Sequence, residues 1–306
     1  HRQNILSFND DIQGTGSVAT TVLLSAMKIK KERLRDQTIA ILGQGQAGTG
    51  IAQQIITALM EDGLSREEAQ DRIFGVDMYG LLVEGMAVND VQKAVQKDRA
   101  QIADWEVADE NNISLLEVVK NSGATVLIGV SGQTDAFSDE VLAAIKKNTN
   151  VPLIMPLSNP TSKTECTPER GLKATDGSCL FATGSPFKPV DVNGQPQRIS
   201  QCNNLYIFPG VGLGALVSGT SMVTDAMFMA ASKKLSDMVT EEELQSKQLL
   251  PSLEKIRELS VQVALSVAVE ARESGLCKQK SDEEFLAEIK KAMWQPEYLP
   301  LRYSGE

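Results

Sequence analysis

The chain has 306 residues, 42% of them hydrophobic, which is enough to build a full core without disulfide or metal staples. Forty acidic against 30 basic residues give a formal net charge of −10, and this balance excludes nucleic acid and anionic membranes as partners. No run approaches the roughly 20 apolar residues of a membrane span, and the first residues lack the pattern of a secretory signal. We therefore expect a soluble, cytoplasmic protein.

The histidine and cysteine content excludes several kinds of catalytic and metal site. The only histidine is His1, so Ser-His-Asp triads, Cys-His pairs and His-ligated zinc are excluded within this chain. The four cysteines are separated by 13, 23 and 75 residues, which matches neither a CxxC pair nor a compact disulfide framework. We predict thiols that are buried or have no special role, and proton transfer falls to Asp, Glu, Lys or Tyr.

The first notable segment is an acidic pair, Asp10 and Asp11, followed by Gly14-Thr15 and a predicted buried helix over 17–31. An Asp-Asp pair by itself is typical of a solvated turn or a helix cap. The alternative is functional: one carboxylate binds a divalent cation while the other serves in hydrogen bonding or proton transfer.

A short β-prone run over 38–42 stops at the loop Gly43-Gln44-Gly45-Gln46-Ala47-Gly48, and a helical pattern over 51–60 follows. The order strand, glycine loop, helix is the one that holds a dinucleotide pyrophosphate at a helix N-terminus. We expect the first glycine to permit the tight turn, the second to let backbone amides approach the anion, and the third to allow close helix packing. A purely structural turn is the alternative.

The next strand, predicted over 73–77, ends at Asp77 after a short helix with a capping box at Ser65. A carboxylate there can accept hydrogen bonds from both ribose hydroxyls and would repel a 2′-phosphate, which favours NAD over NADP. Asp77 follows Gly48 by 29 residues, later than the usual interval of roughly 20, so a strand-end turn residue remains the alternative.

Further elements follow at regular intervals. We predict helices over 115–120 and 138–147, strands over 125–130 and 152–157, and two strand-to-turn units over 180–187 and 205–210. The chain becomes helical after Gly214, with a long amphipathic helix from Pro251 to Gly275 and an extended arm in the last dozen residues. Ser131, Gly132 and Asn159 stand at strand ends, and Asn203 precedes the last unit.

Strands that alternate with helices, each ending in glycine or polar residues, predict an α/β fold. We expect a Rossmann-like, doubly wound, mostly parallel sheet with a C-terminal helical extension, and ligands at the carboxyl edge of the sheet. The whole chain, 1–306, is interpreted as one NAD-binding domain. It consists of an initial segment with the acidic motif and first helix (1–30), a nucleotide-binding core (31–215), and C-terminal helices with a tail (216–306).

Seven blocks in order resemble the malic enzymes, most closely the bacterial NAD-linked form: SFNDDIQGT, ILGQGQAGTGIA, FGVDMYGLL, LIGVSGQT, MPLSNPTSKTECT, FATGSPF and QCNNLYIFPGVGLG. The resemblance runs from about residue 1 to 301. Malic enzymes oxidise (S)-malate with NAD(P) and decarboxylate the bound oxaloacetate to pyruvate with Mg²⁺ or Mn²⁺.

The resemblance implies a role for each matching position. Asp11 corresponds to one of three acidic metal ligands, close to the cofactor, and Asp10 to its neighbour in the catalytic hydrogen-bond network. Asn159 and Asn203 match residues that hold malate and the nicotinamide end. The remaining cofactor positions are Gly43, Gln44, Gly45 and Gln46 in the pyrophosphate loop, Asp77 at the adenosine ribose, and Ser131 and Gly132 along the cofactor.

The resemblance also shows what this sequence lacks. In the family a catalytic tyrosine, a catalytic lysine, a substrate-binding arginine and two acidic metal ligands precede the FNDDIQGT block, and none has a counterpart here. We therefore expect a C-terminal NAD-binding part that needs an N-terminal half, forms homo-oligomers when full length, and alone binds NAD without turning over malate. The alternatives are a malolactic-type enzyme, which converts malate to lactate, and a non-catalytic NAD-binding module.

Overall fold

The computed structural model describes residues 4–298. His1 and the end of the predicted C-terminal arm, with Tyr303, therefore lie outside the described residues. A seven-stranded sheet has the strand order β3-β2-β1-β4-β5-β6-β9. Every neighbouring pair is parallel except β2 and β3. The strands are β1 (Ile39–Leu42), β2 (Ile73–Asp77), β3 (Gly80–Leu81), β4 (Val126–Gly129), β5 (Leu153–Pro156), β6 (Leu180–Thr183) and β9 (Ser200–Gln201).

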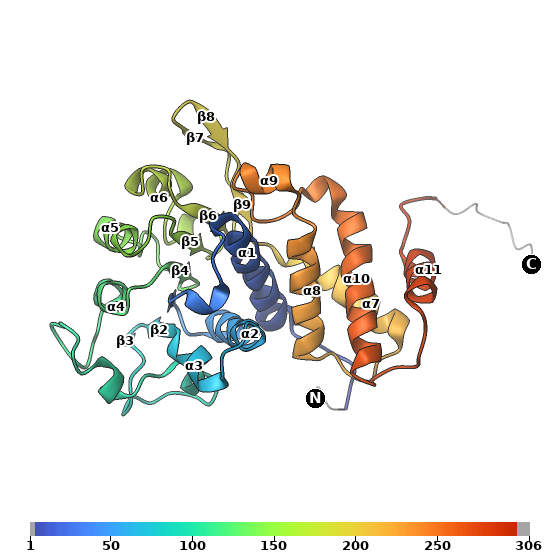
Figure 1. Ribbon diagram of the computed structural model, residues 1–306, viewed down its shortest axis with the longest axis horizontal. Helices are drawn as coiled ribbons and strands as arrows, with labels where there is room; N and C mark the ends of the chain where they lie inside the picture. The colour runs from blue at the N-terminus through green and yellow to red at the C-terminus, as the bar shows by residue number, and fades with distance from the viewer. Residues whose placement is uncertain (1–3, 299–306) are drawn as a thin grey trace, which may run out of the picture.

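Helices cover both faces of this sheet (Figure 1). They are α1 (Thr15–Lys30), α2 (Gln46–Glu61), α3 (Arg66–Asp71), α4 (Leu115–Ser122), α5 (Asp139–Asn148) and α6 (Pro168–Ala174). Ile39 and Ile41 of β1 pack into one core with α1, α2 and the later helices, whereas Ala40 and Leu42 pack into a second core with α4, α5 and α6. All four residues of β1 are therefore buried, as expected of a parallel strand covered on both faces. The predicted Rossmann-like, doubly wound fold is confirmed.

The predicted C-terminal helical extension is also present. It contains α7 (Phe208–Ser218), α8 (Asp225–Asp237), α9 (Glu241–Gln245), α10 (Ile256–Glu273) and α11 (Asp282–Ala292). Helix α10 packs on α7 and α8, and α8 packs on α1, so the extension is joined to the sheet through the first helix (Figure 1). Within 4–298 no helix combines the length and apolar character needed to cross a membrane.

The predicted strand over 205–210 is wrong. Asn204–Tyr206 form a 3₁₀ turn, η6, and α7 begins at Phe208, before the predicted helical start after Gly214. A short apolar run fits a buried strand and a buried helix equally, and Pro209 in the first turn was the helix signal. Further along, α10 begins at Ile256, because a 3₁₀ turn first fills the segment after Pro251. A hairpin, β7 (Val190–Val192) and β8 (Gln195–Gln197), was not predicted.

The cysteines behave as predicted from their spacing. All four are free thiols, and Cys166, Cys179 and Cys202 are buried. Burial raises the pKa of Cys166 to about 12 and that of Cys179 to about 11. Such thiols stay protonated near neutral pH and pack as small apolar side chains.

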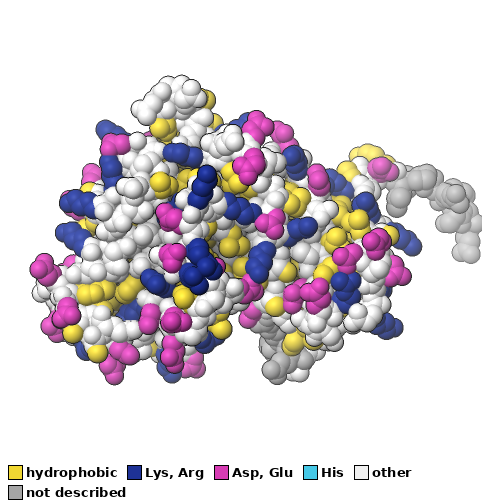
Figure 2. Space-filling view, in the orientation of Figure 1, with side chains coloured by type: hydrophobic (Ala, Val, Ile, Leu, Met, Phe, Trp, Pro, Cys, Tyr) yellow, Lys and Arg dark blue, Asp and Glu magenta, His cyan; other side chains and the backbone are white. Residues whose placement is uncertain are grey.

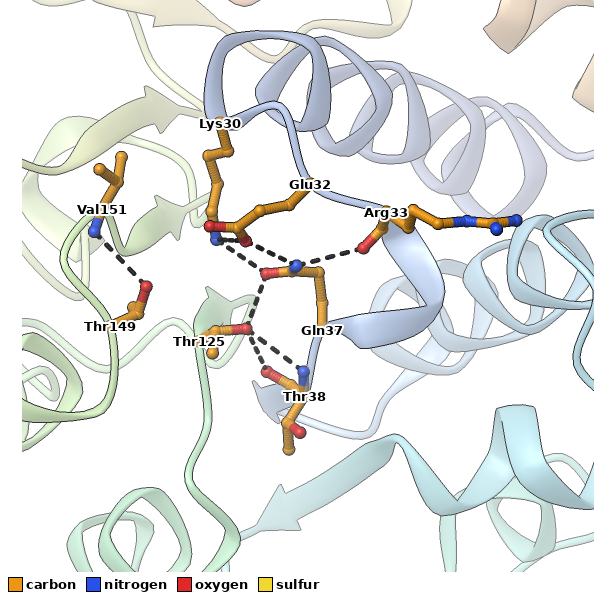
Figure 3. A network of polar contacts seen from close by, with 8 residues as sticks. All are labelled: Lys30, Glu32, Arg33, Gln37, Thr38, Thr125, Thr149 and Val151. Carbon is orange, nitrogen blue, oxygen red and sulfur yellow. Dashed lines mark hydrogen bonds and ion pairs between the residues drawn. The ribbon is translucent and has the colours of Figure 1, made fainter.

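A polar network around the buried Gln37 joins the end of α1 to the amino-terminal edge of the sheet (Figure 3). Gln37, just before β1, donates from Nε2 to the Glu32 carboxylate and the Arg33 carbonyl. Its Oε1 accepts from Lys30 Nζ at 2.8 Å and from Thr125 Oγ1 at 2.9 Å. The Lys30 side chain is fully buried and is also paired with Glu32 at 2.9 Å. We call Lys30, Glu32, Gln37 and Thr125 the amino-edge network.

Acidic and basic side chains are interspersed over the face of the molecule seen in Figure 2. Many of the basic groups lie in ion pairs with carboxylates, such as Lys28 with Asp237 and Lys146 with Asp176. Exposed pairs of this kind contribute little to stability. The fold is therefore held mainly by the two cores on either side of the sheet.

Candidate functional site

The order of the strands predicts a binding crevice at the carboxyl edge of the sheet. β1 has β2 on one side and β4 on the other, so the connections leave β1 in opposite directions. Ligands of open α/β sheets bind at such a switch point, outside the carboxyl ends of the strands. The turns that meet there begin at Gly43 after β1 and at Val130 after β4. The sequence-predicted cofactor loop therefore lies where the fold requires it.

The glycine loop has the backbone geometry expected of a pyrophosphate loop. Gly43 has φ of 97°, and a Cβ on Gly48 would lie 1.8 Å from the Gly43 carbonyl oxygen, so helix α2 begins in direct contact with the turn. Gly45 caps α2 and has no atom within 4 Å of the position a Cβ would occupy. The first turn of α2 thus presents open backbone to the crevice, as an anion requires.

Two of the predicted loop residues have different surroundings. Gln46 is exposed in the first turn of α2, whereas the Gln44 side chain is buried and donates from Nε2 to the Ile41 carbonyl. The Gln44 carbonyl accepts from Gln92 Nε2. The Gln44 side chain therefore packs under the loop, and a contact of Gln44 with a cofactor stays a prediction.

Asp77 ends β2, next to the glycine loop. The Gly43 amide donates to the carbonyl of Val76 at 2.8 Å, which puts the ends of β1 and β2 side by side. The Asp77 side chain is partly exposed and accepts from the Met78 amide at 2.9 Å. A carboxylate has room for further donors. Its role at a ribose stays a prediction.

The turns after β4 and β5 meet on the other side of β1. The Gly132 amide donates to Ser158 Oγ at 2.8 Å, and Asn159 Oδ1 accepts from Ser185 Oγ at 2.5 Å. Gly132 and Asn159 are exposed, and Ser131 is partly exposed. Under these turns lies Glu165, which is fully buried and bonded to Ser131 and Ser158. The sequence prediction assigned Glu165 no role, because nothing in its local pattern shows that it is buried.

The acidic pair lies in a π-helical turn, η1 (Asp10–Gly14), that runs directly into α1. Asn9 caps this turn by accepting from the Ile12 amide. Asn204 Nδ2 donates to the Asp10 carbonyl and to Asp10 Oδ2, both at 3.1 Å, from a position 194 residues away. The other carboxylate oxygen, Oδ1, is buried and has no hydrogen-bond partner among the described residues.

The two carboxylates of the pair have different environments. Burial raises the pKa of Asp10, the hydrogen bond from Asn204 opposes that rise, and the negative charge of Asp11 adds to it. Asp11 is exposed to solvent. The two carboxylates therefore differ in burial and in hydrogen bonding, and their division of roles stays a prediction.

The asparagine that reaches the acidic turn is Asn204, to which the sequence analysis assigned no role, and its neighbour Asn203 points elsewhere. The Asn203 side chain is exposed and accepts from the Leu205 amide at 2.9 Å, which caps the η6 turn. Asn204 was missed because two adjacent asparagines give no signal of which one faces inward. A role for Asn203 in holding malate stays a prediction.

The acidic turn lies directly against the helix of the glycine loop. A Cβ on Gly50 of α2 would lie 2.6 Å from the Ile12 carbonyl oxygen, so the two segments meet backbone to backbone. A cavity of about 550 Å³ opens beside this contact and is lined by residues that include Gln13, Gln46 and Thr49. The structure thus brings together the acidic motif and the nucleotide loop, which are separate in the sequence.

A complete metal centre does not form within the described residues. Among residues 4–298 no three His, Cys, Asp or Glu side chains lie close enough together to hold an ion. Mg²⁺ and Mn²⁺ require several oxygen ligands. Asp10 Oδ1 is an unpartnered buried oxygen and Asp11 is open, so the pair offers part of a ligand shell. No metal-dependent step follows from these residues alone.

A doubly wound sheet with a glycine loop at its switch point and an acidic residue at the end of β2 defines a dinucleotide-binding protein of the Rossmann class. Residues 12–272 match the family described as "Malic enzyme, NAD binding domain". The chain belongs to this family.

Individual relatives of the chain carry the name of the same family. The chain is 48% identical over 303 residues to a protein of Pseudomonas savastanoi pv. phaseolicola named NAD-dependent malic enzyme, covering 99% of this chain and 54% of that protein. It is 44% identical over 299 residues to an Acinetobacter baylyi protein of the same name, covering 97% and 53%. The chain therefore spans about half the length of these curated relatives.

Solved structures show the same fold. A crystal structure of malic enzyme from Pyrococcus horikoshii matches with a TM-score of 0.71 at 24% identity, covering 94% of this chain and 61% of that one. The Entamoeba histolytica malic enzyme matches with a TM-score of 0.72 at 23% identity, covering 94% and 55%. At such identities the likeness establishes the arrangement of helices and strands.

Proposed function

We propose that this chain is the NAD-binding part of an enzyme that oxidatively decarboxylates (S)-malate to pyruvate and CO₂. The observation that carries the proposal is the contact of the acidic turn with α2, which puts Asp10 and Asp11 beside the helix that begins at the nucleotide loop. Membership of the malic enzyme family and the names of the bacterial relatives support it.

The cofactor would lie along the carboxyl edge of the sheet. Its pyrophosphate would accept from backbone amides at the start of α2, and its adenosine ribose would donate to Asp77. The nicotinamide half would extend over Ser131 and Gly132 toward Asn159. Hydride transfer is chemistry of the nicotinamide, and the protein supplies its placement.

At the nicotinamide end, the chain would contribute polar groups for malate and a proton. Asn159 and Asn203 orient the malate carboxylate, and Asp10 holds a proton with its carboxylate fixed by Asn204. Asp11 is proposed as one ligand of Mg²⁺ or Mn²⁺, with the other ligands outside the described residues.

The relatives are about twice as long as this chain, and we propose that the part of the enzyme not included here supplies the remaining catalytic groups. We propose that malate turnover needs a tyrosine, a lysine, an arginine and two acidic metal ligands that are not part of this sequence. The 306 residues act as one NAD-binding domain, the complete enzyme is a cytoplasmic homo-oligomer, and this chain alone binds NAD without oxidising malate.

Calorimetric titration of the purified 306-residue chain tests the proposal. We expect heat of binding with NAD, and weaker binding of NADP because Asp77 repels its 2′-phosphate. A chain that is folded by circular dichroism and gives no heat with either nucleotide would contradict the cofactor assignment. Formation of NADH from malate and Mn²⁺ by this chain would contradict the claim that the catalytic groups are incomplete.

A further inference from the structure

We propose that Glu165 is a positioning residue that holds the nicotinamide side of the cofactor site in shape. It would act through the turns that follow β4 and β5, without touching the cofactor. This inference rests on the proposed binding of NAD.

The contacts of the Glu165 carboxylate all go to these two turns. Oε1 accepts from the Ser131 amide at 2.8 Å, from Ser131 Oγ at 2.9 Å and from Ser158 Oγ at 2.5 Å. Oε2 faces the Ser158 amide at 3.4 Å. The carboxylate thus joins one backbone amide and one hydroxyl from each turn.

Glu165 is an unusual group to bury. Its exposed fraction is 0%, and no lysine or arginine of the part of the chain that is described forms an ion pair with it. A buried carboxylate is costly unless hydrogen-bond donors replace the lost water. Only the two serines offset that cost, so the carboxylate and the turns must keep their relative positions.

The link extends to exposed backbone at the crevice. Ser158 Oγ donates to Glu165 and accepts from the Gly132 amide at 2.8 Å. Gly129, the last residue of β4, leaves the room that the carboxylate fills, since a Cβ there would lie 2.7 Å from Glu165 Cδ. The Glu165 carbonyl accepts from the Phe137 amide, which fixes the backbone that carries the side chain. One buried side chain therefore links both turns.

The position of these turns decides which part of the cofactor depends on Glu165. In doubly wound folds the two halves of the sheet bind the two mononucleotides. Asp77 lies at the end of β2, on the side proposed for the adenosine. The two turns bonded to Glu165 follow β4 and β5, on the opposite side of β1. Loss of the carboxylate should therefore affect the nicotinamide half of NAD and spare the adenosine diphosphate half.

The test compares two ligands on the same variants. Glu165→Gln keeps the side-chain volume but replaces one acceptor oxygen by a donor group, so the four donors can no longer all be satisfied. We expect NAD to bind about tenfold more weakly by calorimetry, and ADP, which lacks the second ribose and the nicotinamide, to bind within about twofold of its original affinity. Ser158→Ala keeps Glu165 but removes the hydroxyl that links it to Gly132. This variant should also weaken NAD binding more than ADP binding, but by less than Glu165→Gln does.

Gln37→Leu is the matched control. Gln37 is equally buried, also makes four side-chain hydrogen bonds, and lies at the opposite edge of the sheet. It should lower the melting temperature without changing the ratio of NAD to ADP affinity. The inference is overturned if Glu165→Gln and Ser158→Ala leave that ratio at its original value. Failure of the unsubstituted chain to bind either ligand would instead contradict the proposed function.

Discussion

The two edges of the sheet both carry polar side chains, but they satisfy them differently. In the amino-edge network, Lys30, Glu32, Gln37 and Thr125 bond to one another, and the fully buried ammonium has two acceptors (Figure 3). At the carboxyl edge, Asp10 leaves one buried carboxylate oxygen unpartnered. Asp11, Gly45 and Gln46 are exposed there as well.

This difference separates a stabilising network from a binding site. A buried polar group without a partner costs free energy, so a fold retains one where a ligand or reaction uses it. None of the four residues of the amino-edge network leaves such a group, so the network should contribute only stability. The carboxyl edge should tolerate changes in its open groups with little loss of stability, while nucleotide binding suffers.

The largest effect is expected at the glycine loop. Gly48→Ala would force a Cβ to within 1.8 Å of the Gly43 carbonyl, so overpacking should cost about 1–3 kcal/mol of unfolding free energy and abolish NAD binding. Gly45→Ala has open space around the new Cβ and should keep its stability while losing NAD affinity, because the methyl group obstructs the pyrophosphate. Urea unfolding and calorimetry measure both. Equal stability of the two variants would refute the packing argument.

The amino edge is tested by Lys30→Met, which keeps the length of the side chain and removes its buried charge. We expect a loss of about 1–3 kcal/mol in urea unfolding at neutral pH, because Gln37 and Glu32 lose a donor. NAD affinity should not change. If Lys30→Met is as stable as the original chain but binds NAD poorly, the amino edge serves binding and not stability, contrary to our interpretation.

The same variant has a predicted pH dependence. Burial acts to raise the pKa of Glu32, but hydrogen bonds from Lys30 and Gln37 outweigh it and hold the pKa below its usual value. For an acid with a lowered pKa, the stabilisation is present above the unfolded pKa of about 4.5 and is lost as the pH falls through the folded value. The difference in stability between the original chain and Lys30→Met should therefore shrink in acid.

A smaller effect, on the pKa of Asp10, is expected from substitution of Asn204. The Asn204 hydrogen bond lowers the pKa of Asp10, so Asn204→Ala should raise that pKa further, which an NMR titration of the Asp10 carboxyl would detect. Asn203→Ala removes only the cap of a 3₁₀ turn and serves as the control. A shift of equal size in both variants would mean that Asn204 has no special relation to the acidic turn.

The smallest effect is expected for Asp10→Asn. Because the folded pKa of Asp10 is raised, its ionised form opposes folding above that pKa, and the penalty disappears as the pH falls below the unfolded value of about 3.9. The amide should therefore stabilise the chain at neutral pH by less than about 1 kcal/mol, since solvent screens a half-buried charge. Thermal unfolding at pH 7 and pH 3 would show the gain only at pH 7.

Local sequence patterns predicted most of the elements at this site. Continuous apolar runs before Gly43, Asp77 and Ser131 gave strands β1, β2 and β4, and the Ser65 capping box gave α3. The segment 205–210 was mistaken for a strand because a short apolar run has no period that separates a strand from a helix. The partners of the acidic pair could not be predicted by spacing, since Asn204 lies 194 residues from Asp10.

The sequence by itself determined the family, the doubly wound fold and the position of the nucleotide loop, because these depend on residue order and on backbone preferences that act over a few residues. Only the tertiary structure decided that Asn204 and not Asn203 reaches Asp10, and that Glu165 is buried beneath two turns. The physical reason is that burial and hydrogen bonding between distant segments arise from packing around the sheet, which no local pattern contains.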